Sequence, residues 1–173
     1  MFIAQKLRKQ STSAYLIYMY QVEDLVRAYA LDAERIAAEY LPRFDYDADQ
    51  LRQATEWYAA LCRMMREEGK QQGGHLQVVQ NTLDLLEDRH RELLAGSDKH
   101  LYNAAYYKAL PFIVELRSQG NNRDKSEMEN CIDALYGATL LGMQGKELSA
   151  GTKAALGPIT QLVQLAEAKD NDE

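Results

Sequence analysis

Ala14-Tyr15-Leu16-Ile17-Tyr18-Met19-Tyr20 runs directly into Gln21-Val22-Glu23-Asp24. The first stretch is apolar on every face that a helix could present. A helix that is hydrophobic all round is buried, either in a membrane or inside a bundle. A stretch this short cannot span a bilayer, which needs about 20 residues. The sequence therefore predicts that this helix lies inside a helical bundle, enclosed by protein.

The rest of the chain also has a helical pattern. It holds 173 residues with only 3 prolines, and long segments repeat apolar residues with the helical period. A chain of this length predicts one domain. We expect an all-α, single-domain, mostly antiparallel bundle of about six to seven helices over residues 1–168, followed by a disordered acidic tail over residues 169–173. The expected helices cover approximately residues 3–29, 32–42, 47–69, 75–95, 98–118, 126–145 and 152–168.

Several helix starts are marked by capping residues. Asp32 is expected to cap the second helix, and Asp47 with Gln50 three residues later predicts a capping box. The helices over 3–29 and 98–118 are the most apolar, so we expect them at the centre of the bundle. Lys108 and Glu115 mark the narrow polar edge of the second of these helices.

Charge and cysteine usage limit the possible partners and compartment. The net charge of −6 argues against nucleic-acid binding, which needs a basic surface, and the cluster of Lys6, Arg8 and Lys9 fits a solvated helix start. Cys62 and Cys131 belong to no metal-binding or redox motif, which favours reduced, buried thiols. We therefore expect a cytoplasmic protein that binds neither membrane nor nucleic acid.

The sequence contains no recognisable catalytic motif, and we assign it no catalytic residue, metal or cofactor. Glu87 and His90 have the spacing of a di-iron motif, but the second motif and the additional glutamates that such a site needs are missing. His90 lies in an apolar stripe, which predicts a core histidine bonded to a carbonyl or a tyrosine. Whether the chain is an enzyme stays open, with no positive argument for one.

Polar residues that follow the apolar stretch allow two interpretations. Glu23 and Arg27 are four residues apart, a spacing that predicts an exposed ion pair on one helix. Alternatively, Gln21, Glu23 and Asp24 border a groove where another helix or subunit docks.

The leading functional hypothesis is a non-enzymatic interaction or structural module that self-associates as a homodimer. Its basis is apolar surface away from the main stripes, which needs further cover. The candidate interface residues are Leu16, Ile17, Tyr20 and Val114, and Tyr107 shares this property.

The alternative hypothesis is a small-molecule-binding protein or enzyme with a tyrosine-lined pocket near Pro111. Proline cannot donate to the carbonyl of Tyr107, so an acceptor becomes available inside an apolar helix. The candidate pocket residues are Glu23, His75, Tyr106, Tyr107 and Glu115.

Five stretches give the chain a likeness to a known family: residues 18–28, 74–76, 104–117, 134–137 and 145–147. On these, the chain resembles, nearly end to end, the bacterial family called domain of unknown function 4924. Members of that family often have Trp where Tyr20 stands, which keeps an aromatic ring at this position. The resemblance implies an all-helical bacterial cytoplasmic protein and supplies no activity, cofactor or catalytic residue.

Overall fold

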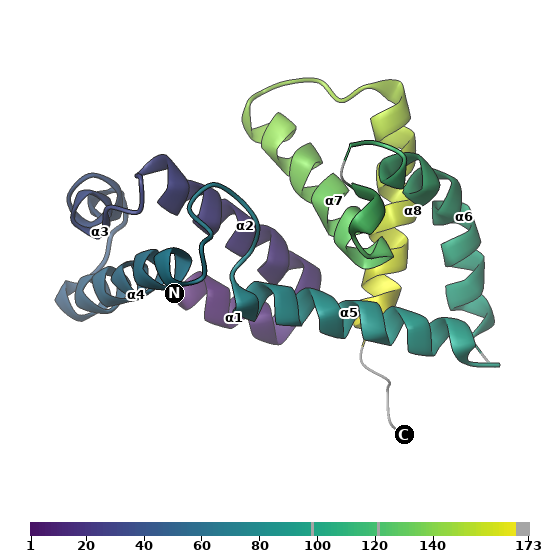
Figure 1. Cartoon of the computed structure of the whole chain (residues 1–173), viewed down its shortest axis with the longest axis horizontal. Coiled ribbons are helices and arrows are strands. Elements are labelled where there is room, and N and C mark those ends of the chain that lie inside the picture. The colour runs from purple at the N-terminus through teal and green to yellow at the C-terminus, as the bar shows by residue number, and fades with distance from the viewer. Residues whose placement is uncertain (98, 121, 169–173) are drawn as a thin grey trace. The chain divides into compact units, whose positions relative to one another are not determined.

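A computed structural model describes residues 1–97, 99–120 and 122–168 of the chain (Figure 1). These residues form eight α-helices and no strand, so the expected all-α fold is confirmed. The tail predicted over residues 169–173 lies outside the described residues. The helices are α1 (Phe2–Gln10), α2 (Thr12–Ala28), α3 (Ala33–Arg35), α4 (Ala48–Glu67), α5 (Gln77–Ala95), α6 (His100–Arg117), α7 (Glu127–Met143) and α8 (Ala150–Glu167). A π-helical turn (Ile36–Tyr40) and short 3-10 turns (Leu41–Arg43, Asn122–Asp124) complete the helical structure.

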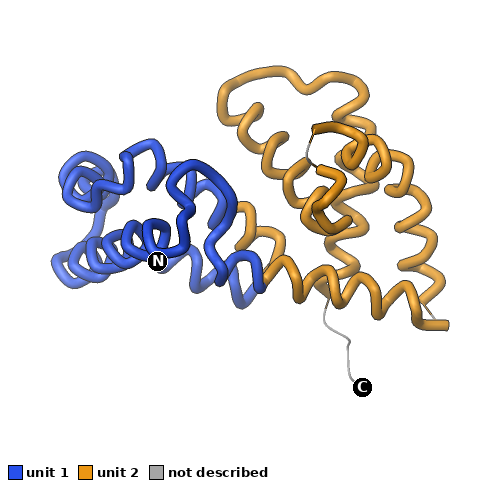
Figure 2. The backbone as a smooth tube through the Cα atoms, viewed as in Figure 1, with its two compact units in different colours: residues 1–10, 18–81 blue, residues 11–17, 82–173 orange. Residues whose placement is uncertain are grey.

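The contacts divide the chain into two compact units (Figure 2). Unit 1 contains residues 1–10 and 18–81, and unit 2 contains residues 11–17 and the described residues from Thr82 onward. The helices α2 and α5 therefore contribute to both units. No described helix has both the length and the apolar character needed to cross a membrane.

The single helix expected over residues 3–29 is divided at Ser11 into α1 and α2. The Ser11 hydroxyl accepts a hydrogen bond from the Ala14 N–H at 3.1 Å, in the manner of a helix cap. Glu167, in the last turn of α8, reaches the same helix start: its carboxylate accepts from the Ser13 N–H at 2.6 Å and from the hydroxyls of Ser11 and Ser13. These contacts satisfy backbone groups that a continuous helix would not expose.

In unit 1, α4 packs against α3 and the turns that follow α3. Both predicted helix starts in this region are confirmed. The Asp32 carboxylate accepts from the Arg35 N–H, and Asp47 and Gln50 form a reciprocal capping box at the start of α4. The buried side chains here include Val26, Ile36, Leu41, Ala54, Leu61, Cys62 and Met65.

In unit 2, α6, α7 and α8 pack against one another. The helix over 98–118 is expected at the centre of the bundle, but within unit 2 it is covered on one face only. α6 buries Ala105, Ala109 and Ile113 on one face, whereas Tyr107 and Val114 on the opposite face are 70% and 60% exposed. The helix is apolar on both faces, but other helices of the unit cover only one of them.

The apolar stretch that opens α2 is buried at Tyr15, Leu16, Met19 and Tyr20 and partly buried at its other positions. Leu16 and Tyr20 are 0% and 2% exposed, and Ile17 is half-buried. Because Leu16 and Tyr20 are already covered within one chain, their burial requires no second copy of the protein.

Candidate functional site

Glu23 is a buried carboxylate in α2, with only 1% of its surface exposed. One carboxylate oxygen lies 2.7 Å from Nδ1 of His75, and the other accepts the backbone N–H of Leu76 at 2.8 Å. The His75 ring is stacked on Tyr20, with ring centroids 3.8 Å apart. A buried carboxylate needs such partners to offset the loss of hydration. The pair fixes the His75 ring against α2.

The prediction of an exposed Glu23–Arg27 ion pair is therefore wrong. The four-residue spacing is correct for a pair, but the loop between α4 and α5 folds over α2 and buries Glu23. Arg27 pairs with Asp24 at 3.0 Å, and its Nε donates to the Lys70 carbonyl at 3.1 Å. Another N–H of Arg27 donates to the Gly74 carbonyl. Glu23 and Arg27 together hold the α4–α5 loop at residues 70–76.

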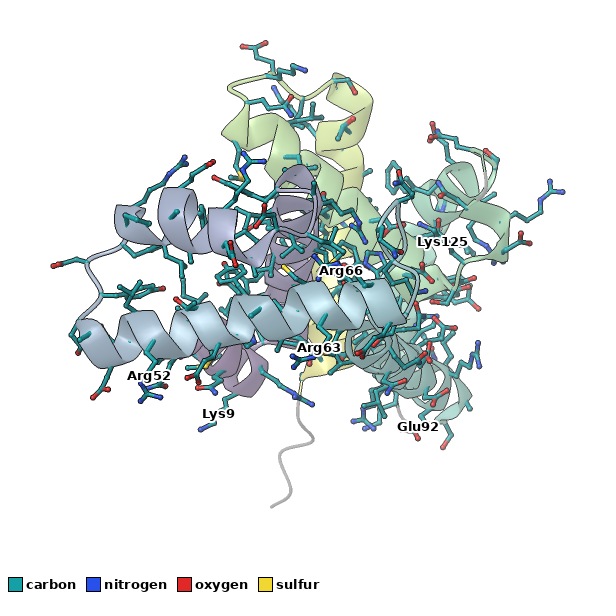
Figure 3. All side chains as sticks on the ribbon, turned by 60° about the vertical axis from the view of Figure 1, so that its left-hand side comes forward. Lys9, Arg52, Arg63, Arg66, Glu92 and Lys125 are labelled. Atoms are coloured by element: carbon teal, nitrogen blue, oxygen red, sulfur yellow. The ribbon has the colours of Figure 1, made fainter. Side chains whose placement is uncertain are left out.

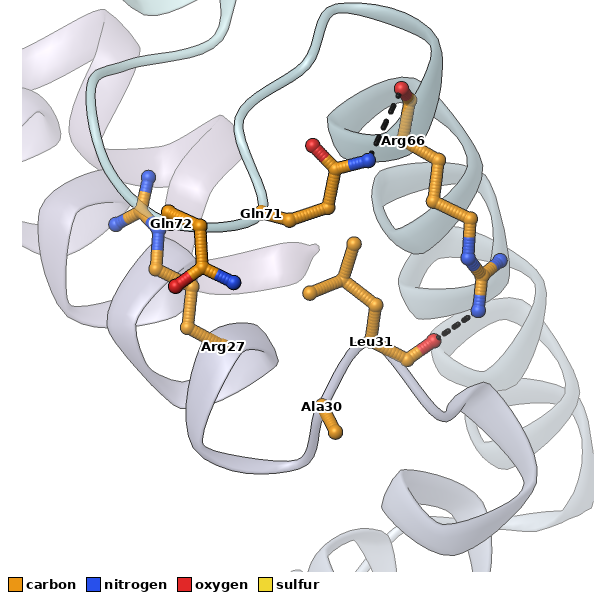
Figure 4. A pocket seen from close by; sticks show the side chains of 6 residues that line it. All are labelled: Arg27, Ala30, Leu31, Arg66, Gln71 and Gln72. Atoms are coloured by element: carbon orange, nitrogen blue, oxygen red, sulfur yellow. Dashed lines mark hydrogen bonds between the residues drawn. The ribbon is translucent and has the colours of Figure 1, made fainter.

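A cavity of about 490 Å³ lies beside this loop in unit 1 (Figure 4). Arg66, near the end of α4, donates to the Leu31 carbonyl at 2.6 Å on one side of it. Figure 4 shows Gln71 and Gln72 of the loop between the two arginines that line the cavity. The complete lining is Arg27, Ala30, Leu31, Arg66, Gln71 and Gln72.

His90 is the second histidine with a carboxylate partner, and it lies in unit 2. It is 3% exposed, with Nδ1 2.6 Å from the Tyr102 hydroxyl and Nε2 3.3 Å from the Glu127 carboxylate. The prediction of a core histidine bonded to a tyrosine is confirmed. The imidazole joins α5, α6 and α7 through both ring nitrogens.

The groups around His90 shift one another's pKa values through hydrogen bonds and charge. The hydrogen bond from His90 is the main reason that the pKa of Glu127 is lowered, with a smaller contribution from Tyr106, which donates at 3.4 Å. Burial, reinforced by Glu127, raises the pKa of Tyr106 to about 12. Arg117 lies 3.6 Å from the same carboxylate. The network holds Glu127 ionised and Tyr106 protonated at neutral pH.

A cavity of about 460 Å³ adjoins His90, and most of its charged side chains pair with carboxylates or guanidinium groups of neighbouring residues. Glu87 caps α7 by accepting the Met128 N–H at 3.1 Å, and it pairs with Arg91 at 3.0 Å. Lys125 pairs with Asp133 at 2.5 Å. These pairs tie the helices together and leave Arg91, Arg117 and Lys125 with carboxylate partners.

The exposed side of α6 is a different kind of surface, which we call the α6 face: Ala104, Tyr107, Pro111 and Val114. These residues are spaced by three, four and three positions, so they form one stripe along the helix. Lys108 and Glu115 border the stripe on one edge. Neither of these charged side chains forms an ion pair with another described residue.

The five predicted pocket residues fall in three places. Glu23 and His75 are in contact in unit 1, Tyr106 is part of the His90 network in unit 2, and Tyr107 and Glu115 lie on the exposed side of α6. Sequence reasoning missed Arg66 and Glu127, whose partners are distant in the chain. Among the described residues, no group of three or more His, Cys, Asp or Glu side chains is placed to hold a metal ion.

The sequence profile of one family, described as a domain of unknown function (DUF4924), matches residues 1–173. The chain belongs to the DUF4924 family. Neither a curated protein nor a solved structure matches it. Membership in DUF4924 supplies no activity, so the function of the chain has to be argued from its own surfaces.

Proposed function

We propose that this DUF4924 chain is a helical interaction module that self-associates through the α6 face. The observation that supports this proposal is the 70% and 60% exposure of Tyr107 and Val114 on one stripe of one helix. Burying a large apolar side chain is worth roughly 1.5–3 kcal/mol. Contiguous exposed apolar surface of this kind is typical of a protein–protein contact.

The pattern of the stripe favours another helix as the partner. A spacing of three and four residues is the repeat with which helices pack along each other. Leu101, 67% exposed, extends the apolar surface by one further turn. An exposed stripe along several turns of one helix can pack along the side of another helix, whereas a small molecule binds in a concave pocket.

Charge complementarity favours a second copy of this chain. Lys108 and Glu115 lie on the same edge of the stripe, seven residues apart. When two copies of α6 pack antiparallel about a two-fold axis between residues 111 and 112, Lys108 of each copy lies beside Glu115 of the other. In a parallel pair, Lys108 of one copy instead lies beside Asn103 of the other, which carries no charge. In an antiparallel pair shifted by one heptad, Lys108 of one copy lies beside Lys108 of the other, so that like charges face each other. The antiparallel pairing about residues 111 and 112 matches both charges.

Leu85 on α5 provides a comparison. It is also 70% exposed, but its helical neighbours Asn81, Asp88 and Arg89 are polar. A single exposed apolar residue among polar ones is common on protein surfaces and carries no argument for a contact.

Sedimentation velocity over micromolar concentrations tests the proposal. We expect the wild-type chain to dimerise, and Tyr107→Glu or Val114→Glu to weaken the dimer at least about tenfold, because each copy then places a charge in the contact. Leu85→Glu is the matched control and should leave the dimer intact. A wild-type monomer at all concentrations, or equal weakening by Leu85→Glu, would overturn the proposal.

We also propose that this homodimer is a bacterial cytoplasmic protein, and the state of its cysteines supports a reducing compartment. Cys62 and Cys131 are both free and buried, and burial raises the pKa of each thiol, that of Cys131 to about 12. Unreactive, unpaired thiols are typical of a reducing compartment.

A further inference from the structure

The cavity between the ends of α2 and α4 has a cationic lining in an acidic chain. Its walls contain two guanidinium groups, from Arg27 and Arg66, and the carboxamides of Gln71 and Gln72, but no carboxylate. The chain as a whole has a net charge of −6. Arg27 is paired with Asp24 at 3.0 Å, so the positive charge that sets this lining apart from the acidic chain comes mainly from Arg66.

Arg66 carries the least compensated of these charges. Its Nη2 bonds the neutral carbonyl of Leu31, and no carboxylate among the described residues forms an ion pair with its guanidinium. A guanidinium has five N–H donors in a planar fork that matches a carboxylate or a phosphate. Arg66 and Arg63 both extend from α4 (Figure 3). Of the two, Arg66 belongs to the lining of the cavity and Arg63 does not.

The cavity walls are held in place before any ligand arrives. Arg27 bonds the carbonyls of Lys70 and Gly74, and Glu23 bonds the N–H of Leu76, so the loop that carries Gln71 and Gln72 is fixed at its ends. A fixed loop loses little conformational freedom when a ligand binds.

The opposite wall is a turn in a left-handed backbone conformation. Ala30 and Leu31 have φ values of 53° and 60°, a conformation that non-glycine residues adopt at a cost. The N–H of Leu31 bonds the Val26 carbonyl at 2.9 Å, which stabilises the turn. This turn directs the Leu31 carbonyl toward Arg66 and fixes the position of the guanidinium.

We infer that this cavity binds the oxyanion of a small molecule, a carboxylate or phosphate group held by Arg66 together with Arg27 and the loop carboxamides. The C-terminal ends of α2 and α4 carry a partial negative charge of about −0.5 each, which offsets part of the cationic lining. Binding must therefore come from short charge-assisted hydrogen bonds to the guanidinium fork. The site lies within unit 1 and does not depend on self-association through α6.

Isothermal titration of the full chain with sodium phosphate and with sodium acetate, each against sodium chloride at equal ionic strength, tests the inference. We expect binding of phosphate, of acetate or of both, and the two titrations distinguish a phosphate site from a carboxylate site. Arg66→Gln should weaken binding at least about tenfold. Arg66→Lys keeps the charge but loses the fork, so it should bind with intermediate affinity.

Arg63→Gln is the matched control, because it removes the same charge one turn earlier on α4 at a residue outside the cavity. It should bind as the wild type does. If Arg66→Gln does not fold, Gln72→Glu replaces it as the test. Gln72 is exposed, and a carboxylate there should abolish binding by repulsion without disturbing the fold.

Three results would overturn the inference. Wild-type heats equal to those of chloride would mean that no site exists. Equal weakening by Arg63→Gln and Arg66→Gln would mean that the anion responds to overall charge only. Unchanged binding in Arg66→Gln, with a lowered unfolding temperature, would mean that Arg66 only satisfies the Leu31 carbonyl.

Discussion

The carboxylate of Glu23 lies 2.7 Å from Nδ1 of His75, although the two residues are 52 positions apart in the chain. This contact anchors the loop between α4 and α5 to α2. It places a buried charge at a point where the sequence pattern predicts an exposed one. The contact stabilises the fold because the buried Glu23 carboxylate and the Leu76 N–H would each lose their hydrogen-bond partner without it, which raises the free energy of the folded state.

Glu23→Ala should destabilise the fold by about 2–4 kcal/mol, because it leaves the Leu76 N–H without its acceptor and opens a cavity beside His75. Glu23→Gln should cost less, since the amide can accept from Leu76 and donate to a neutral His75 ring. Urea unfolding measures both changes. Glu34→Gln, at an exposed position in α3, should stay within about 0.5 kcal/mol of the wild type. A small effect of Glu23→Ala would show that the contact does not stabilise the fold.

The chain should lose stability as the pH rises from 10 to 12. Burial raises the pKa of Tyr18 and of Tyr106 from 10.0 to about 12. In this range the folded chain keeps both phenolic protons while the unfolded chain releases them, so the free energy of unfolding falls with pH. Urea unfolding at a series of pH values measures the slope. Tyr106→Phe should flatten it, whereas Tyr107→Phe, at a 70% exposed ring, is the control. An unchanged slope in Tyr106→Phe would contradict the assignment.

Charge reversal tests the antiparallel pairing of α6. Lys108→Glu and Glu115→Lys should each weaken the dimer by roughly tenfold, because each change removes two symmetric ion pairs worth about 0.2–1 kcal/mol apiece and introduces like charges. The double variant restores opposite charges and should recover the wild-type dissociation constant. Sedimentation equilibrium at low salt gives these constants. Failure of the double variant to recover, with the single variants weakened, would exclude this register while leaving the α6 face as the contact.

The sequence was most informative where structure is local. Asp47 and Gln50 are three residues apart, and their capping box follows from that spacing alone. His90 lies in an apolar stripe, which was enough to predict a buried ring bonded to a tyrosine. The all-helical class follows from the same periodicity.

Features that depend on distant partners could not be predicted in this way. Helical spacing pairs Glu23 with Arg27, and only the folded α4–α5 loop shows that Glu23 is buried. Arg66 acquires its position from the Leu31 carbonyl, 35 residues earlier. The apolar composition of α6 predicts a central position, but the number of neighbouring helices decides which of its faces is covered.

The first turn of α2 depends on a side chain that is synthesised much later than α2 itself. The carboxylate that accepts the Ser13 N–H belongs to Glu167, 154 residues later. Because a ribosome delivers the N-terminal segment first, this amide lacks its acceptor until the last turn of α8 has been synthesised. A product truncated before the last turn of α8 would carry every residue of α2 and still lack the group that closes its first turn.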